Sequence, residues 1–381
     1  SSKRRHGTWE KCGQNPRELA ERVVENIDFG EFVESAEVAG PGFINIRLTD
    51  DTIVSMLNKM SVEDLGVEPD QDTHPVAIDL CGVNVAKQLH VGHLRSTIIG
   101  DTLSRLFERV GRKVFRENHL GDWGLPIAMV LEWLISQKID FETLSLEELN
   151  LAYRDAKLGS KDEARGMVFA EKMQAGPHRF IELEEQNSGA AEAQASVKDI
   201  LNALQQGDEG LHRDWQKLIN CTMRSVFASL DLLNVKIGPE NSRGESFYRD
   251  RLGNVVALFT ESGLGKEDDG AIVVKFKDRK RPMLIQKSDG GFLYSTTDLA
   301  AIQFRTQELC ADRVIYVVDS RQRDHFKDLF DAARLIGWDK TPSGAAVDFV
   351  HLPFGSVLGQ DKKPLKTRSG STVTLDSLLE E

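Results

Sequence analysis

The chain has 381 residues, of which 40% are hydrophobic, and a formal net charge of −12. This length accommodates two domains or one large α/β domain with insertions, and the apolar content is enough for substantial cores. The acidic total argues against a protein whose whole surface binds nucleic acid, although a local basic groove can coexist with it.

The cysteines and the apolar runs exclude further classes of protein. Four cysteines are widely separated and form no CxxC pair: Cys12, Cys81, Cys221 and Cys310. Neither a zinc site nor a disulfide framework is indicated, and a reducing cytosol fits. No apolar run approaches the roughly 20 residues that span a bilayer, and the first residues lack the apolar segment of a secretory signal. We therefore expect no membrane partner, and the absent initiator Met indicates an incomplete chain.

Residues 1–50 are predicted to be the remnant of an α+β domain. Apolar residues on one helical face predict a helix over 18–29, and alternation predicts a half-buried strand over 43–48. A linker helix is expected over 51–72.

Residues 73–140 carry the pattern of the first half of a Rossmann-like nucleotide-binding fold. Short apolar runs predict buried strands at 75–81 and 113–117. Between them, apolar residues at helical spacing predict a helix that ends at Gly111.

The segment before this helix predicts a phosphate site, because His90 and His93 flank Gly92 there. A strand, a tight turn and a helix place unpaired N–H groups and a positive dipole end at the carboxyl edge of the sheet. A nucleotide triphosphate is the expected ligand. In isolation, two histidines around a glycine more often mark a metal site or a helix-capping pair.

Residues 141–245 are predicted to be a mostly helical insertion that splits the sheet. Long amphipathic stretches predict helices at 144–158 and 211–234. The stretch 182–209, rich in Ala, Gln and Glu, is either an exposed helix or a partly mobile loop.

Residues 246–371 are predicted to form the second half of the nucleotide fold, ending in a Lys-rich loop. Four strands alternating with two helical patterns are expected to complete the parallel sheet. The strands are placed at 270–276, 282–287, 313–318 and 348–352, and the helices at 298–309 and 324–336. Residues 372–381 open a further helix.

The tetrapeptide His90-Val91-Gly92-His93 resembles the HIGH signature of class I aminoacyl-tRNA synthetases. A lone HxGH is weak evidence, but other segments match the arginyl-tRNA synthetase family in order. These are Asn84 and Lys87 upstream, then 94–101, 118–124, 244–248, 286–291, 293–298, 319–322 and 363–368. The chain is therefore similar to the catalytic core of that family, and the matches are weakest in 158–240.

This resemblance implies a class I synthetase fold, with a parallel sheet split by a helical insertion. Residues 1–50 then correspond to an N-terminal domain that contacts the tRNA. Residues 372–381 would begin a helical anticodon-binding domain that the chain lacks.

The resemblance also assigns the ATP site. Amino-acid activation is attack by a carboxylate on the α-phosphorus of ATP, so the site must align the reactants and neutralise the charge that develops on pyrophosphate. His90 and His93 would donate hydrogen bonds to the triphosphate, and Gly92 would leave room for adenosine. Mg²⁺ is expected on the ATP phosphates rather than in a protein cage.

Cations are expected to close over the pyrophosphate. Lys366 and Arg368 stand where class I synthetases carry a mobile lysine loop. Lys87 stands where the arginyl family is thought to place a compensating charge, three residues before the first His. Taken alone, the Lys-rich run that contains Lys366 is more often a solvent-exposed turn.

A guanidinium substrate calls for carboxylates that can accept paired hydrogen bonds. Tyr294 and Asp298, one helical turn apart, match the family's residues for the arginine side chain, with Glu245 as a second acid and Gln322 as a pocket amide. Asn84 would bind the α-amino or carboxyl group. Without the resemblance, Asp298 reads as an ordinary acid of a helix's first turn.

The chain departs from the family directly before Asn84. Cys81-Gly82-Val83-Asn84 stands where Ser-Ser/Ala-Pro-Asn is usual, so a proline that stiffens this approach is replaced by Val83.

The leading hypothesis is an arginine–tRNA ligase core that uses L-arginine, ATP and tRNA(Arg), as a cytoplasmic monomer. One alternative is a truncated paralogue that binds arginine and ATP without aminoacylation. Another is an enzyme that loads arginine onto a non-tRNA acceptor.

Overall fold

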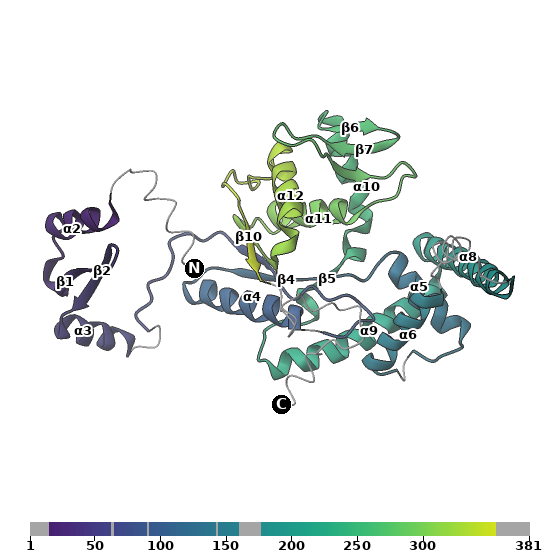
Figure 1. The fold of residues 1–381 in the computed structure, drawn as a ribbon, viewed down its shortest axis with the longest axis horizontal. Coiled ribbons are helices and arrows are strands. Elements are labelled where there is room, and N and C mark those ends of the chain that lie inside the picture. The colour runs from purple at the N-terminus through teal and green to yellow at the C-terminus, as the bar shows by residue number, and fades with distance from the viewer. Residues whose placement is uncertain (1–14, 62–64, 90, 142–143, 160–176, 356–381) are drawn as a thin grey trace. The chain divides into compact units, whose positions relative to one another are not determined.

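A computed structural model describes residues 15–61, 65–89, 91–141, 144–159 and 177–355 (Figure 1). The chain divides into two units, residues 1–71 and 72–381.

The first unit is a small α+β structure. Its elements are α2 (Pro16–Asn26), β1 (Val33–Ala39), β2 (Phe43–Leu48) and α3 (Asp50–Met60), and the two strands pair antiparallel. Side chains cap both helices: Asn15 accepts from the N–H of Arg17, and Thr49 accepts from that of Thr52. The helix and the strand predicted here are confirmed, whereas β1 was not predicted and α3 ends well before residue 72.

The second unit is built on a parallel sheet of five strands in the order β10-β9-β3-β4-β5. The strands are β3 (Val76–Asp79), β4 (Val114–Leu120), β5 (Ser242–Gly244), β9 (Arg313–Asp319) and β10 (Asp348–Phe354). Four of the predicted strands are confirmed. All four residues of β3 are buried, as expected for a strand covered on both faces.

Two predicted strands do not join this sheet, so that part of the prediction was wrong. They are β7 (Ala271–Val274) and β8 (Met283–Gln286), which pair antiparallel with each other, and β7 also pairs antiparallel with β6 (Gly265–Asp268). The β6–β7 turn places Asp269 and Gly270 at φ 50° and 79°, as in a tight hairpin. Parallel neighbours need a crossover of about a dozen or more residues, and the connections 269–270 and 275–282 are both shorter, so β6, β7 and β8 pair antiparallel in a sheet of their own.

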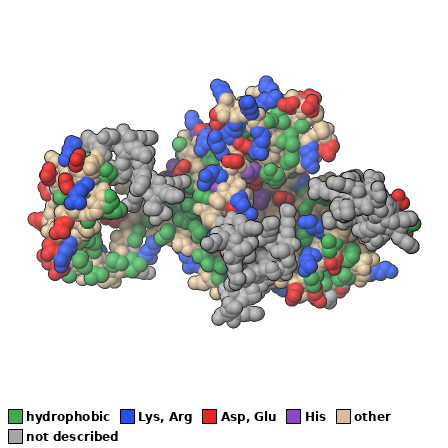
Figure 2. Space-filling view, in the orientation of Figure 1, with side chains coloured by type: hydrophobic (Ala, Val, Ile, Leu, Met, Phe, Trp, Pro, Cys, Tyr) green, Lys and Arg blue, Asp and Glu red, His purple; other side chains and the backbone are tan. Residues whose placement is uncertain are grey.

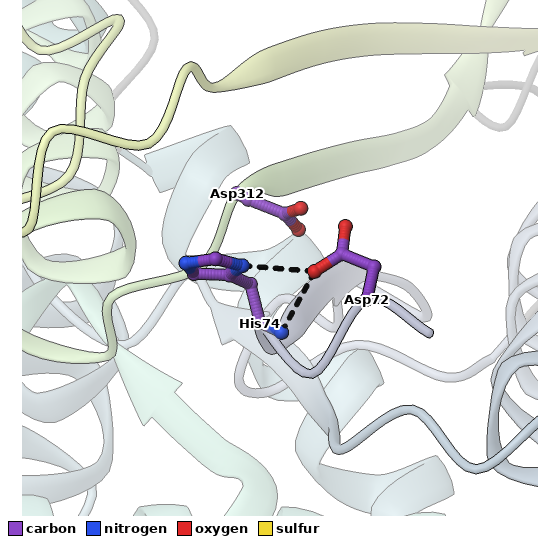
Figure 3. Close-up of side chains that lie close together, drawn as sticks. All are labelled: Asp72, His74 and Asp312. Atoms are coloured by element: carbon purple, nitrogen blue, oxygen red, sulfur yellow. Dashed lines mark hydrogen bonds and ion pairs between the residues drawn. The ribbon is translucent and has the colours of Figure 1, made fainter. Parts of the chain in front are cut away.

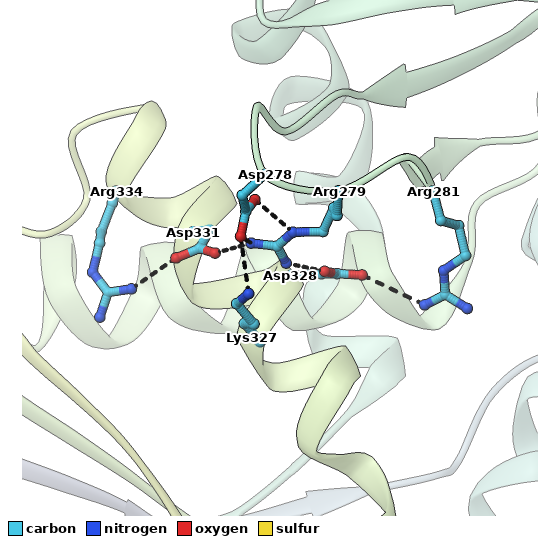
Figure 4. Close-up of polar contacts among 7 residues, drawn as sticks. All are labelled: Asp278, Arg279, Arg281, Lys327, Asp328, Asp331 and Arg334. Atoms are coloured by element: carbon cyan, nitrogen blue, oxygen red, sulfur yellow. Dashed lines mark hydrogen bonds and ion pairs between the residues drawn. The ribbon is translucent and has the colours of Figure 1, made fainter.

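An ion-pair network attaches this small sheet to α12 (Arg323–Leu335), as Figure 4 shows. Arg279, between β7 and β8, pairs with both Asp328 and Asp331 of the helix. Asp278 accepts from Lys327 at 2.9 Å.

Helices cover both faces of the parallel sheet. On one face lie α4 (Val91–Arg109) and α9 (Glu209–Leu232), and on the other lie α10 (Glu245–Glu261), α11 (Tyr294–Gln303) and α12. Alternating strand residues divide between these two cores: Ile78 packs with the first pair, and Ala77 packs with the second group.

A third core joins α9 to the helices of the insertion. These are α5 (Leu125–Ser136), α6 (Leu146–Gly159) and α8 (Pro177–Gln206). The stretch 182–209 is therefore helical over most of its length, which decides between its two predicted states. Among the helices described, none is both long and apolar enough to cross a membrane.

Candidate active site

The segment after β3 turns sharply through left-handed backbone. Cys81, Gly82 and Ala86 have φ values of 72°, 69° and 65°. Such a conformation costs a non-glycine residue about 1–3 kcal/mol and persists only where the surroundings enforce it.

Side chains from three distant elements enforce this conformation. The N–H groups of Cys81, Gly82 and Ala86 donate to Ser96 Oγ of α4, Asn118 Oδ1 of β4 and Thr222 Oγ1 of α9, at 3.1, 3.2 and 3.1 Å. Each buried N–H is thereby satisfied, and the turn is fixed to the sheet and to both helices beneath it.

Backbone pairing fixes the approach to Asn84, where Val83 stands in place of the expected proline. The Gly121 N–H donates to the Val83 carbonyl at 2.8 Å, and the Val85 N–H donates to the Gly121 carbonyl at 3.1 Å. Asn84 is thus held in a parallel bridge with Gly121 just beyond β4, with an exposed side chain. A Cβ at Gly121 would lie 2.6 Å from Asn84 Oδ1, so a glycine is needed for this approach.

The predicted ATP-site residues are described only in part. Gly92 and His93 lie in the first turn of α4, after the carboxyl end of β3. Lys87 is half-buried, with its ammonium 4.7 Å from the centre of the Tyr153 ring of α6. His90, Lys366 and Arg368 lie outside the described residues.

Three carboxyl groups meet at the carboxyl edge of the sheet. Asp122 follows β4, Glu245 follows the adjacent strand β5 as the first residue of α10, and Asp298 lies in α11. Burial raises the pKa of Glu245 to about 7, with the negative charges of Asp122 and Asp298 adding to the effect. Among the described residues, no cation pairs with Glu245.

Asp122 holds the start of α10. Its carboxylate accepts from the N–H and the Oγ–H of Ser246, at 2.9 and 2.6 Å, so it acts as a cap from outside the helix. Burial raises the pKa of this carboxyl, and the bonds from Ser246 oppose that rise. A Cβ at Gly244 would lie 1.9 Å from Asp122 Oδ2. Asp122 and Gly244 thus set where Glu245 stands.

Asp298 has a partner that the sequence analysis missed. Its Oδ2 lies 2.6 Å from Nε2 of His325 in α12. The exposed Tyr294 places its ring 5.1 Å from the same imidazole, and Gln322 is exposed at the residue before α12. The only sequence signal for His325 is its position three residues after Gln322, because residues at that spacing share one face of a helix.

A buried ionic network lies in the core between the sheet and α10. Arg305 is 1% exposed and pairs with Asp79 at 2.7 Å and with Glu117 at 3.9 Å. Arg243 donates to Glu117 at 2.6 Å. Burial raises the pKa of Tyr248, which adjoins this network one turn after Glu245, so its hydroxyl stays neutral. The sequence analysis missed these residues because isolated charges carry no periodicity.

A different cluster of potential metal ligands lies at the amino edge of the sheet. Asp72, His74 and Asp312 converge before β3 and β9, as Figure 3 shows. Arg112 already supplies a cation there: it pairs with Asp72 at 3.0 Å and with Asp312 at 2.6 Å.

Comparisons with known proteins identify the family of the chain. The model of the arginyl tRNA synthetase N terminal domain matches residues 7–48, and that of the class I (R) tRNA synthetase catalytic domain matches residues 56–381. Proteins named arginine–tRNA ligase from Pasteurella multocida and a Picosynechococcus species are each 39% identical over 97% of the chain, which covers 62% and 59% of their lengths. The chain thus spans about three-fifths of these curated relatives.

Solved structures show the same fold. The arginyl-tRNA synthetase of Plasmodium falciparum matches with a TM-score of 0.65 and 28% identity, over 92% of this chain and 58% of its own. That of Thermus thermophilus matches with a TM-score of 0.66 and 20% identity, over 98% and 62%, which shows the fold alone. Since the catalytic-domain model matches most of the sequence, the chain belongs to the arginyl-tRNA synthetase family of class I tRNA synthetases.

Proposed function

We propose that the chain carries the catalytic core of an arginine–tRNA ligase. It activates L-arginine with ATP to arginyl-adenylate and pyrophosphate, and transfers arginine to the 3′ end of tRNA(Arg). The observation that carries the proposal is the group of Asp122, Glu245 and Asp298, in which Glu245 lacks a cationic partner among the described residues. A planar guanidinium, which donates several N–H bonds at once, is the cation that such carboxylates bind best.

The neighbouring strand and helix suit the ATP half of the reaction. The start of α4, with Gly92 and His93, stands at the carboxyl edge where phosphates are favoured. Lys87, His90, Lys366 and Arg368 are our candidates for neutralising the charge on pyrophosphate, with Asn84 binding the arginine main chain. Mg²⁺ would arrive on the ATP phosphates.

The reaction needs no covalent nucleophile, and the cysteine beside the site is unsuited to be one. Burial raises the pKa of Cys81 to about 11, so its thiol stays protonated at neutral pH. The arginine carboxylate itself is the attacking group.

A local basic surface supports an RNA partner despite the acidic total. Figure 2 shows Lys and Arg side chains gathered over α12 and the adjoining β7–β8 hairpin. Exposed members of this surface are Lys277, Lys280, Arg281 and Lys327, of which Arg281 and Lys327 also pair with Asp328 and Asp278. Phosphate contacts of this kind are screened by salt, so tRNA binding should weaken as ionic strength rises. We further propose a cytoplasmic monomer.

Arginine-dependent exchange of pyrophosphate into ATP, measured with and without tRNA(Arg), tests the proposal. Exchange that requires arginine and tRNA would support it. Exchange without tRNA would instead favour transfer to another acceptor. If exchange is absent and calorimetry detects no arginine binding, the proposed function is wrong.

A further inference from the structure

His325 and Asp298 form a directional contact in the arginine subsite. A carboxylate can only accept hydrogen bonds, so Nε2 of His325 carries the proton and donates to Oδ2 of Asp298 across 2.6 Å. The other oxygen, Oδ1, has no hydrogen-bond partner among the described residues. The two oxygens of Asp298 therefore differ before any ligand arrives.

Packing fixes the imidazole in this position. The ring lies edge-on to Tyr294, at 5.1 Å and 62°, and to Phe326, at 5.2 Å and 70°. The side chains of His325 and Asp298 are only 19% and 23% exposed. Because the donor is held from both α11 and α12, it can hold the plane of the Asp298 carboxylate in turn.

We propose that His325 is a positioning residue of the arginine subsite: it retains Oδ2 of Asp298 and leaves Oδ1 to receive the guanidinium together with Glu245. The inference rests on the proposed function, since it takes Asp298 as an arginine ligand. Glu245 is close enough to Asp298 for the charge of Asp298 to raise its pKa. Two acceptors supplied by two carboxylates suit the diverging N–H groups of a planar guanidinium better than the compact ammonium of lysine.

Calorimetric titration of the chain with L-arginine tests this role. His325→Ala should raise the Kd for arginine about tenfold, because Asp298 then loses its fixed orientation. His325→Gln, whose amide N–H can reach the same oxygen, should recover most of the loss. A merely structural role would not be rescued in this way. Melting temperatures of both variants, measured alongside, show whether either substitution also lowers stability.

A double-mutant cycle separates the inference from the function on which it rests. With Asp298→Asn as background, adding His325→Ala should change the Kd by less than about twofold. Arg334→Ala, at the far end of α12, is the matched control and should leave arginine binding unchanged.

Three outcomes would overturn the inference. Tighter arginine binding by His325→Ala would make the imidazole a competitor rather than a support. Unchanged binding by His325→Ala, while Asp298→Asn binds weakly, would refute the role of His325 alone. Absence of arginine binding by the unaltered chain would refute the proposed function, and with it this inference.

Discussion

Carboxylates cluster at both edges of the parallel sheet, but among the described residues only the amino-edge cluster contains a guanidinium. At the amino edge, the buried Arg112 pairs with Asp72 and Asp312 and donates to the His74 carbonyl at 2.8 Å. At the carboxyl edge, Asp122, Glu245 and Asp298 lie close together, and in the part of the chain that the structure describes no cation pairs with Glu245.

The carboxyls of the amino-edge cluster shift in both directions, because burial and the hydrogen bond with Asp72 raise the pKa of Asp312, whereas the pKa of Asp72 falls. The hydrogen bond from the backbone N–H of His74 holds the pKa of Asp72 well below its usual range. Hydrogen bonds from neighbouring side chains and the charge of Arg112 add to this effect. Burial and like charges raise the pKa of Glu245 to about 7. The first cluster already contains its cation, Arg112, whereas the second is the one that we propose to bind the guanidinium of arginine.

Removing the cation of the amino-edge cluster should have the largest effect. Arg112→Met leaves Asp72, Asp312 and the His74 carbonyl without their donor, so the free energy of unfolding should fall by about 4 kcal/mol. Urea unfolding measures this loss. Arg213→Met, which removes an exposed pair with Glu209 at 3.9 Å, is the control and should cost less than about 0.5 kcal/mol. A loss as small for Arg112 would contradict its structural role.

Neutralising an acid of the carboxyl-edge cluster should instead affect binding. Asp298→Asn keeps the shape but removes the charge, so the Kd for arginine should rise about 100-fold, or about 3 kcal/mol. The affinity for ATP should be spared. Asp250→Asn, an exposed acid of α10, should change neither. An unaltered Kd for arginine in Asp298→Asn would exclude Asp298 from the subsite.

The sequence predicted where the strands lie better than it predicted which strands pair. Buried apolar runs located β3, β4, β9 and β10, because each strand shows its own burial pattern. The positions of β7 and β8 were predicted as well, but their sheet was not, since a local pattern does not name the partner strand.

The residues of the candidate site were likewise predicted only in part. Family motifs indicated Asn84, Glu245 and Asp298, which the structure places along the carboxyl edge. His325 and Arg305 were missed because their roles depend on pairing across the fold: Arg305 meets Asp79 from 226 residues away along the chain. Such contacts follow from topology and leave no local signature.

The raised pKa of Glu245 predicts a pH dependence that Asp72 should not share. Between the unfolded value of 4.5 and the folded value of about 7, the folded state holds the Glu245 proton more tightly. Its contribution to stability is therefore lost as pH rises through this window, by about 2.5 kcal/mol between pH 5 and pH 8. Urea unfolding at pH 5 and pH 8 should show Glu245→Gln gaining that amount relative to the unaltered chain. An equal pH dependence in both proteins would contradict the assignment.

The smallest effect concerns the glycine beside Asn84. In Gly121→Ala the new Cβ would lie 2.6 Å from Asn84 Oδ1, and because that oxygen ends an exposed side chain, Asn84 should move rather than the fold yield. Arginine affinity should fall about fivefold, or about 1 kcal/mol, with little change in stability. Gly253→Ala is the matched control, since nothing lies within 4 Å of its Cβ within α10; it should leave affinity unchanged and stabilise the helix by about 0.5–1 kcal/mol. Equal arginine affinity in both variants would contradict the role of Asn84 in arginine binding.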